Sequence, residues 1–100
     1  MTTYSMKLVT VITEALTKVP LCRLLSEVGA HGYTVIPVEG MGSKGIREGD
    51  LPEYANIQVE VILQPAAAEV LLGRLEKDFF SCYAMVAYVT DVGVLRLEKF

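Results

Sequence analysis

The sequence predicts an α+β fold, a ferredoxin-like sandwich in which an antiparallel four-stranded sheet carries two helices on one face. Four apolar segments rich in β-branched residues alternate with two segments whose apolar residues repeat at helical spacing. Their order along the chain is β-α-β-β-α-β, which is the order of the split βαβ arrangement. One hundred residues suffice for one domain, so we expect residues 1–100 to form a single domain.

Composition narrows the class of protein. Apolar residues make up 52% of the chain, and the mean hydropathy of +0.41 is high for a small domain that faces water on all sides. A net charge of −3 disfavours non-specific binding to nucleic acid. No apolar run approaches the roughly 20 residues of a membrane helix, and the N-terminal MTTYSMK does not resemble a signal peptide. We therefore expect a cytoplasmic protein that binds no nucleic acid.

The first half of the chain predicts a strand and a helix. The strand is expected at Lys7–Thr13, and both of its faces are apolar enough to be covered. The helix is expected at Thr17–Val28, with Thr17 as a candidate N-cap. Pro20 is tolerated only in the first turn, and Gly29 is a natural helix terminator. The apolar stripe of this helix consists of Leu21, Leu24, Leu25 and Val28.

The remaining segments complete the predicted order. We expect strands at Tyr33–Val38, Asn56–Leu63 and Met85–Thr90, a helix at Ala66–Phe80, and either a short fifth strand or a C-terminal extension at Val94–Lys99. Pro37 removes one hydrogen-bond donor, so the strand that contains it is expected at an edge or a bulge. The apolar stripe of the second helix consists of Ala68, Leu71, Leu72, Leu75 and Phe79.

The face of the sheet that the helices leave open is also predicted to be apolar. Whichever way the strands are turned, it carries Leu8 or Val9, Val59 or Ile62, and Val86 or Ala87. Because apolar surface of this extent is usually covered, we infer that self-association buries this face. The alternative is a monomer with a mildly apolar face.

The stretch Glu39–Tyr54 is polar and rich in glycine. Its segment Gly40–Gly45 matches the dinucleotide-binding pattern G-x-G-x-x-G and follows a strand, but it does not open a helix, so that interpretation is rejected. Glycines still allow backbone N–H groups to turn towards an anion, and Lys44 and Arg47 add positive charge. Two interpretations stay open: a phosphate or carboxylate site at the base of this loop, or a solvated surface loop.

Residues for catalysis or metal binding are sparse. Cys22 and Cys82 are too few for a disulfide framework, and we expect both as buried or half-buried free thiols. His31 is the only histidine and has no neighbouring ligand, so no metal site is expected. Ser43 and Ser81 have no evident base, and no catalytic residue is predicted.

Three segments together resemble a known family: GAHGYTVIPVEGMGSKG, EYANIQVEVIL and FFSCYAMVAYVTDVGVLR. From Lys7 to about Arg96 the chain resembles the PII signal-transduction superfamily, and within it the PII-like, SbtB-like proteins associated with bicarbonate transport and carboxysomes. The resemblance implies a homotrimer with adenine-nucleotide sites in the clefts between subunits. It also implies that residues 39–54 form the T-loop, which contacts partner proteins in that family.

The resemblance also implies which residues bind the nucleotide. The implied set has two cleft-lining residues, four at the base of the T-loop and three in a loop that closes over the nucleotide: Thr34 and Val35; Gly42, Ser43, Lys44 and Arg47; Tyr83, Ala84 and Met85. Met85 stands where glycine is usual in SbtB-like proteins, and the chain lacks their cysteine-bearing tail, so no redox switch is expected there. It also lacks the glycine- and lysine-rich phosphate loop of nitrogen-regulatory PII proteins, so tight sensing of ATP with 2-oxoglutarate is not expected.

The function implied by this resemblance is that of a non-enzymatic sensor. It would bind AMP, ADP or ATP, and the sequence leaves open whether bicarbonate binds as well. Its partner would be a membrane transporter or a carboxysome-linked protein. Two alternatives stay open: a structural or interaction module without a ligand, and a weak nucleotide phosphohydrolase. A CutA-like metal-tolerance protein shares the fold, but the chain lacks ligating histidines and cysteines.

Overall fold

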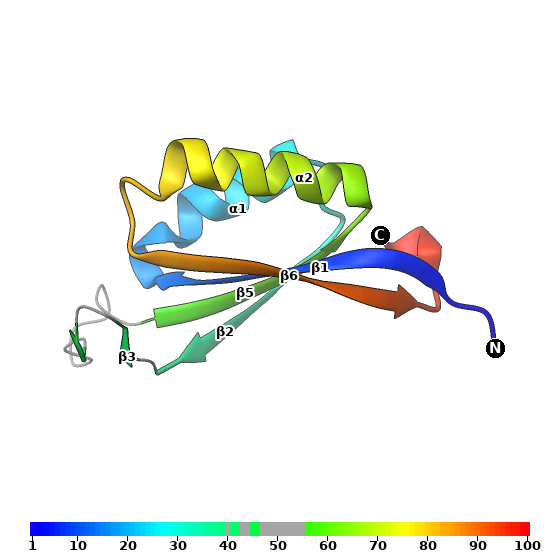
Figure 1. Ribbon diagram of the computed structural model, residues 1–100, viewed down its shortest axis with the longest axis horizontal. Coiled ribbons are helices and arrows are strands. Elements are labelled where there is room, and N and C mark those ends of the chain that lie inside the picture. The colour runs from blue at the N-terminus through cyan, green and yellow to red at the C-terminus, as the bar shows by residue number, and fades with distance from the viewer. Residues whose placement is uncertain (40, 43–44, 47–55) are drawn as a thin grey trace.

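The computed structural model describes residues 1–39, 41–42, 45–46 and 56–100. Its elements are β1 (Tyr4–Glu14), the 3-10 turn η1 (Ala15–Thr17), α1 (Lys18–Glu27), β2 (Thr34–Val38), β3 (Met41–Gly42), β4 (Gly45–Ile46), β5 (Asn56–Leu63), α2 (Pro65–Arg74), the π-helical turn η3 (Leu75–Phe79), β6 (Met85–Val94) and the 3-10 turn η4 (Leu97–Lys99). Four strands form an antiparallel sheet in the order β2-β5-β1-β6, and both helices lie on one face of it (Figure 1). The predicted ferredoxin-like sandwich is confirmed.

Strand β1 lies at the centre of the sheet. It pairs with β5 from Lys7 to Glu14 and with β6 from Tyr4 to Thr13. At its N-terminal end β1 therefore runs beyond β5 and pairs with β6 alone. This extended pairing explains why both strands are longer than their apolar composition predicted.

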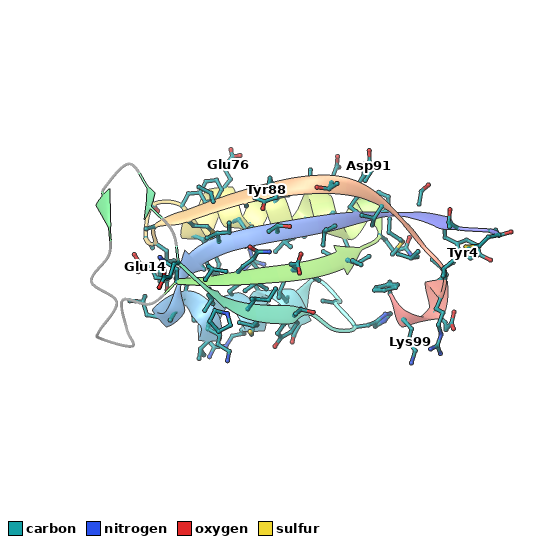
Figure 2. All side chains as sticks on the ribbon, turned by 90° about the horizontal axis from the view of Figure 1, so that it is seen from below. Tyr4, Glu14, Glu76, Tyr88, Asp91 and Lys99 are labelled. Carbon is teal, nitrogen blue, oxygen red and sulfur yellow. The ribbon has the colours of Figure 1, made fainter. Side chains whose placement is uncertain are left out.

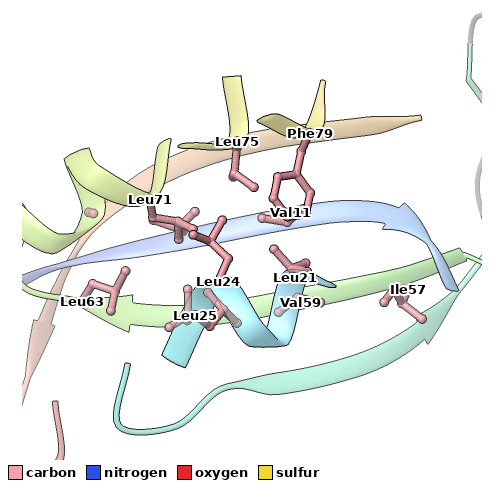
Figure 3. Packing of buried hydrophobic residues seen from close by; sticks show 13 residues of the cluster. Val11, Leu21, Leu24, Leu25, Ile57, Val59, Leu63, Leu71, Leu75 and Phe79 are labelled. Carbon is pink, nitrogen blue, oxygen red and sulfur yellow. The ribbon is translucent and has the colours of Figure 1, made fainter. Parts of the chain in front are cut away.

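The face of the sheet under the helices forms the core. Strand β5 has the bounds predicted for it, and every second residue from Ile57 to Leu63 is buried. Leucines of the two predicted helical stripes pack onto these side chains (Figure 3). The buried cluster consists of Val9, Val11, Leu21, Leu24, Leu25, Ile57, Val59, Val61, Leu63, Ala68, Leu71, Leu75 and Phe79.

The opposite face of the sheet carries no helix. Since Val9, Val61 and Ala87 pack into or against the core, the residues next to them in the chain, Leu8, Ile62 and Val86, occupy this open face. The side chains of Ile36, Val86 and Tyr88 are exposed by 37%, 57% and 49%. Figure 2 looks onto this face and labels Tyr88. As predicted, this face carries apolar side chains, and polar residues such as Thr10 and Glu60 lie between them.

The two ends of α1 differ from each other. At the C-terminus Gly29 has a φ of 87°. The N–H of Ala30 donates to the carbonyl of Leu25 over 3.0 Å, and the N–H of Gly29 donates to the carbonyl of Ser26 over 3.1 Å. This is a Schellman ending, so the predicted terminator is confirmed. At the N-terminus Thr17 makes no side-chain capping bond, because its hydroxyl is buried beside that of Thr13. Thr17 therefore occupies the N-cap position as predicted, but its side chain does not cap the helix.

Three further boundaries differ from the prediction. The expected helix Ala66–Phe80 begins at Pro65 and changes to a π-helical turn at Leu75. Of the two alternatives for Val94–Lys99, a C-terminal extension is confirmed and a fifth strand is wrong, because Val94 ends β6 and a 3-10 turn follows. The glycine-rich stretch contains a short antiparallel ribbon, β3–β4, that the sequence did not predict.

Replacing Gly29 by alanine should lower the free energy of unfolding by about 1 kcal/mol, because a side chain is strained at positive φ. Gly73→Ala is the matched control: it lies in α2, and an added Cβ would meet no atom within 4 Å. That variant should gain about 0.5–1 kcal/mol from the better helix propensity of alanine. Urea unfolding at one fixed protein concentration measures both, and effects of the same sign would contradict this account of α1.

Candidate functional site

The first group of predicted site residues lies on and after β2. Thr34 is exposed on the open face and pairs with Glu60, whereas Val35 packs against the core. Gly42 lies in β3 opposite Gly45. The other three residues predicted at the base of the T-loop lie outside the described residues: Ser43, Lys44 and Arg47.

The second group leads into β6 at the other edge of the sheet. Tyr83 and Met85 are half-buried and pack against the core cluster. Met85 pairs with Thr13 of β1, so its side chain is directed towards the helices and away from the open face. Any contact that Met85 makes on the open side must therefore use its backbone.

The loop before β6 is held from two directions. From the end of η3, the carbonyl of Phe79 accepts hydrogen bonds from the N–H groups of Cys82 and Tyr83, each over 2.9 Å. The ring centroids of Phe79 and Tyr83 lie 5.6 Å apart. From the sheet, the hydroxyl of Thr13 donates to the carbonyl of Ala84 over 2.9 Å. The sequence predicts Thr13 in a strand and Phe79 in a helical stripe, and no pattern in it indicates their contacts with this loop.

The two groups lie at opposite edges of the sheet. Across the strands, Met85 is in register with Thr13, Ile57 and Pro37, which are successive neighbours in β1, β5 and β2. Three strand spacings separate the edges, which is about 14 Å. Strand β2 finishes and β6 begins at the same end of the sheet (Figure 1). Thr34 and Val35 are the first two residues of β2 and lie further from this end than Met85 does. One protomer therefore does not bring the Thr34 side and the Tyr83 side of the predicted site together.

Charged groups and thiols around the helices have structural partners. Arg74 bonds to Asp78 over 2.9 Å and to Glu27 over 3.2 Å, which ties α2 and its π-helical turn to α1. The bond to Asp78 is the main cause that raises the pKa of Arg74. Likewise a side-chain hydrogen bond with Cys22 raises the pKa of Tyr33, which precedes Thr34.

The expectations for cysteine, metal and membrane segments can be compared with the described residues. Cys22 is half-buried as predicted, but Cys82 is exposed, because it lies in the turn after Phe79 and not in the helical stripe. Across residues 1–39 and 56–100, no three side chains of the His, Cys, Asp or Glu type gather as metal ligands. No helix in the described part of the chain is long and apolar enough to cross a membrane.

Phe79→Ala should lower the free energy of unfolding by about 3–5 kcal/mol, because it removes a buried ring from both the core and the contact with Tyr83. Phe80→Ala is the matched control, since Phe80 is 47% exposed and Phe79 only 7%. The control should stay within about 0.5 kcal/mol of the parent protein. Urea unfolding distinguishes the two, and equal losses would contradict the placement of Phe79.

Known proteins resemble this chain in sequence and in fold. The model of the family "Nitrogen regulatory protein P-II" matches residues 6–99. A PII-like signaling protein from Thermus thermophilus is 41% identical, with 100% of this chain and 99% of that chain covered and a TM-score of 0.87.

Two structures of CPII, a nitrogen regulatory PII-like protein from Thiomonas intermedia, are also similar. The form bound to ADP and bicarbonate is 31% identical, with 99% and 97% of the two chains covered and a TM-score of 0.89. The form bound to ADP, AMP and bicarbonate is 29% identical, with 99% and 96% covered and a TM-score of 0.91. On the match of the family model over residues 6–99, this chain belongs to the P-II family.

Proposed function

We propose that this protein is a non-enzymatic PII-like sensor that binds AMP, ADP or ATP, with bicarbonate, in the clefts between the subunits of a homotrimer. One observation carries the proposal: the two halves of the predicted site lie at opposite edges of one sheet. A site that uses both halves needs a second subunit. The binding of ADP, AMP and bicarbonate by the similar CPII supports adenine nucleotide as the ligand.

The open face of the sheet supports the trimer. Ile36, Val86 and Tyr88 leave apolar surface on different parts of this face, and no helix of the described chain covers it. In the proposed trimer the open faces of three sheets pack against one another. The β2 edge of one subunit then lies beside the β6 edge of the next, so that Thr34 of one subunit and Tyr83–Met85 of the other line the same cleft.

The base of the proposed T-loop, residues 39–54, supplies groups suited to anions. The glycines around Gly42 leave backbone N–H groups free to approach a phosphate closely, together with the N–H of Ser43. Lys44 and Arg47 add two positive charges, and the guanidinium of Arg47 can bond to two phosphate oxygens at once. Bicarbonate is an anion that the same kinds of donor can hold.

Regulation in this proposal acts through the T-loop. Phosphate contacts at its base stabilise one shape of the loop, and a change in the number of phosphates changes those contacts and shifts the population. The partner protein that binds this conformation of the loop is a bicarbonate transporter or a carboxysome-linked protein. The SbtB-like features of the sequence support this choice of partner.

Calorimetry with AMP, ADP, ATP and bicarbonate tests the ligand. Arg47→Ala should raise the Kd for ADP about ten- to hundredfold, which corresponds to the loss of charge-assisted hydrogen bonds, and should change the Kd for adenosine about twofold or less. Arg23→Ala, which removes an exposed arginine of α1, should leave both values unchanged.

Two results would contradict the ligand assignment. The first is no heat with any of the four compounds from protein shown to be folded. The second is an equal loss of ADP and adenosine binding in Arg47→Ala. Assays of phosphate release from ATP and ADP, with and without Mg²⁺, should show no turnover, and measurable turnover would favour a phosphohydrolase.

Sedimentation equilibrium tests the assembly. The parent protein should show three times the 11.0 kDa of one chain. Tyr88→Glu should give monomers, because it places a charge on the open face where the subunits are proposed to meet. Val70→Glu changes a similarly exposed apolar residue of α2 and should leave the trimer intact. The reverse pattern would mean that the helical face forms the interface.

A further inference from the structure

Three threonines are the buried polar residues of the described part of the chain, and two of them form a pair on the helix-covered side of the sheet. Thr13 at the end of β1 and Thr17 in η1 are exposed by 2% and 0%. Their Oγ1 atoms lie 3.1 Å apart, and that of Thr13 also lies 2.9 Å from the carbonyl oxygen of Ala84. The pair therefore links the beginning of the first helix to the loop before β6.

The chemistry of the hydroxyl groups fixes the direction of these bonds. A carbonyl oxygen only accepts, and a threonine hydroxyl has one proton to donate. Thr13 therefore donates to the carbonyl of Ala84, and Thr17 donates to Thr13. With this direction each buried oxygen has a partner, in agreement with the finding that no buried side-chain polar atom of the described residues lacks one.

Thr13 holds the loop at a point that the contacts from η3 do not reach. The bonds from Phe79 reach Cys82 and Tyr83, whereas the bond from Thr13 reaches Ala84, the last residue before β6. Val9 and Val11 occupy the same face of β1, so a valine at position 13 would fit the strand and lack only the hydroxyl.

We propose that Thr13 is a positioning residue for the nucleotide site: its hydroxyl fixes the loop Tyr83–Met85, and Thr17 orients that hydroxyl. This inference rests on the proposed function, in which that loop closes over the nucleotide. Neither threonine touches the ligand in this account, and their effect on binding is indirect.

Thr13→Val tests the proposal, because it keeps the branched shape and removes the donor. Its Kd for ADP should rise about three- to tenfold, the range expected for the loss of one neutral hydrogen bond. Amide hydrogen exchange at residues 82–85 should become faster in the ligand-free protein. Thr13→Ser keeps the hydroxyl and should restore both measurements to about the parent values.

A core control separates positioning from general destabilisation. Val61→Ala opens a cavity in the core at β5, away from the loop. It should lower the midpoint of thermal unfolding at least as much as Thr13→Val. It should leave the Kd for ADP and the exchange of residues 82–85 unchanged.

If Thr13→Val does not fold, Thr17→Val replaces it in the test. We expect its Kd for ADP to rise about two- to threefold, because Thr13 is then less well oriented.

The outcomes distinguish this inference from the proposed function. If the parent protein binds ADP and Thr13→Val binds it equally well, the positioning role is wrong and the nucleotide site stands. Equal losses of binding in Thr13→Val and Val61→Ala would also overturn the positioning role. If the folded parent protein binds no nucleotide, the proposed function fails and this inference fails with it, whatever the exchange rates show.

Discussion

Two helices can cover one face of a four-stranded sheet, and in this protein both faces of the sheet carry apolar side chains. Helices α1 and α2 bury the side of β1 and β5 that carries Val9, Val11 and Val59. On the other side Leu8 and Val86 lie on the face that the helices leave open. This constraint connects the fold to the proposed assembly: the open face is where we place the neighbouring subunits, and the edges of the same sheet carry the two halves of the site.

Much of this fold could be predicted from the sequence because its signals are local. The alternation in Asn56–Leu63 gave the bounds of β5, and Gly29 ended α1 as expected. The failures have non-local causes. Strands β1 and β6 extend beyond their apolar segments because each provides the hydrogen-bonding partner of the other. Thr17 is the N-cap residue of α1, but its hydroxyl bonds to Thr13 and not to the helix, a competition that helix preferences do not describe.

The candidate site was less predictable than the fold. The sequence predicted a strand that contains Thr34 and Val35, but only the resemblance to PII proteins connected them with a nucleotide. The roles of Lys44 and Arg47 stay predictions. The bond from Thr13 to Ala84 joins residues 71 positions apart, and no spacing in the sequence indicates it. A threonine on an otherwise apolar strand face was the one signal available, and such a residue is compatible with many partners.

The two edges of the sheet differ in how they are protected from unwanted pairing with other chains. Strand β2 has five residues, and Pro37 removes one of its donors, so this edge is a poor template for another strand. Strand β6 has ten residues, and in the described sheet it pairs only with β1. Its outer backbone groups form a long edge beside exposed valines such as Val86 and Val89. The short length of β2 and its proline thus protect that edge without help from another chain. The β6 edge lacks such features, so a subunit that covers it also protects the protein against aggregation.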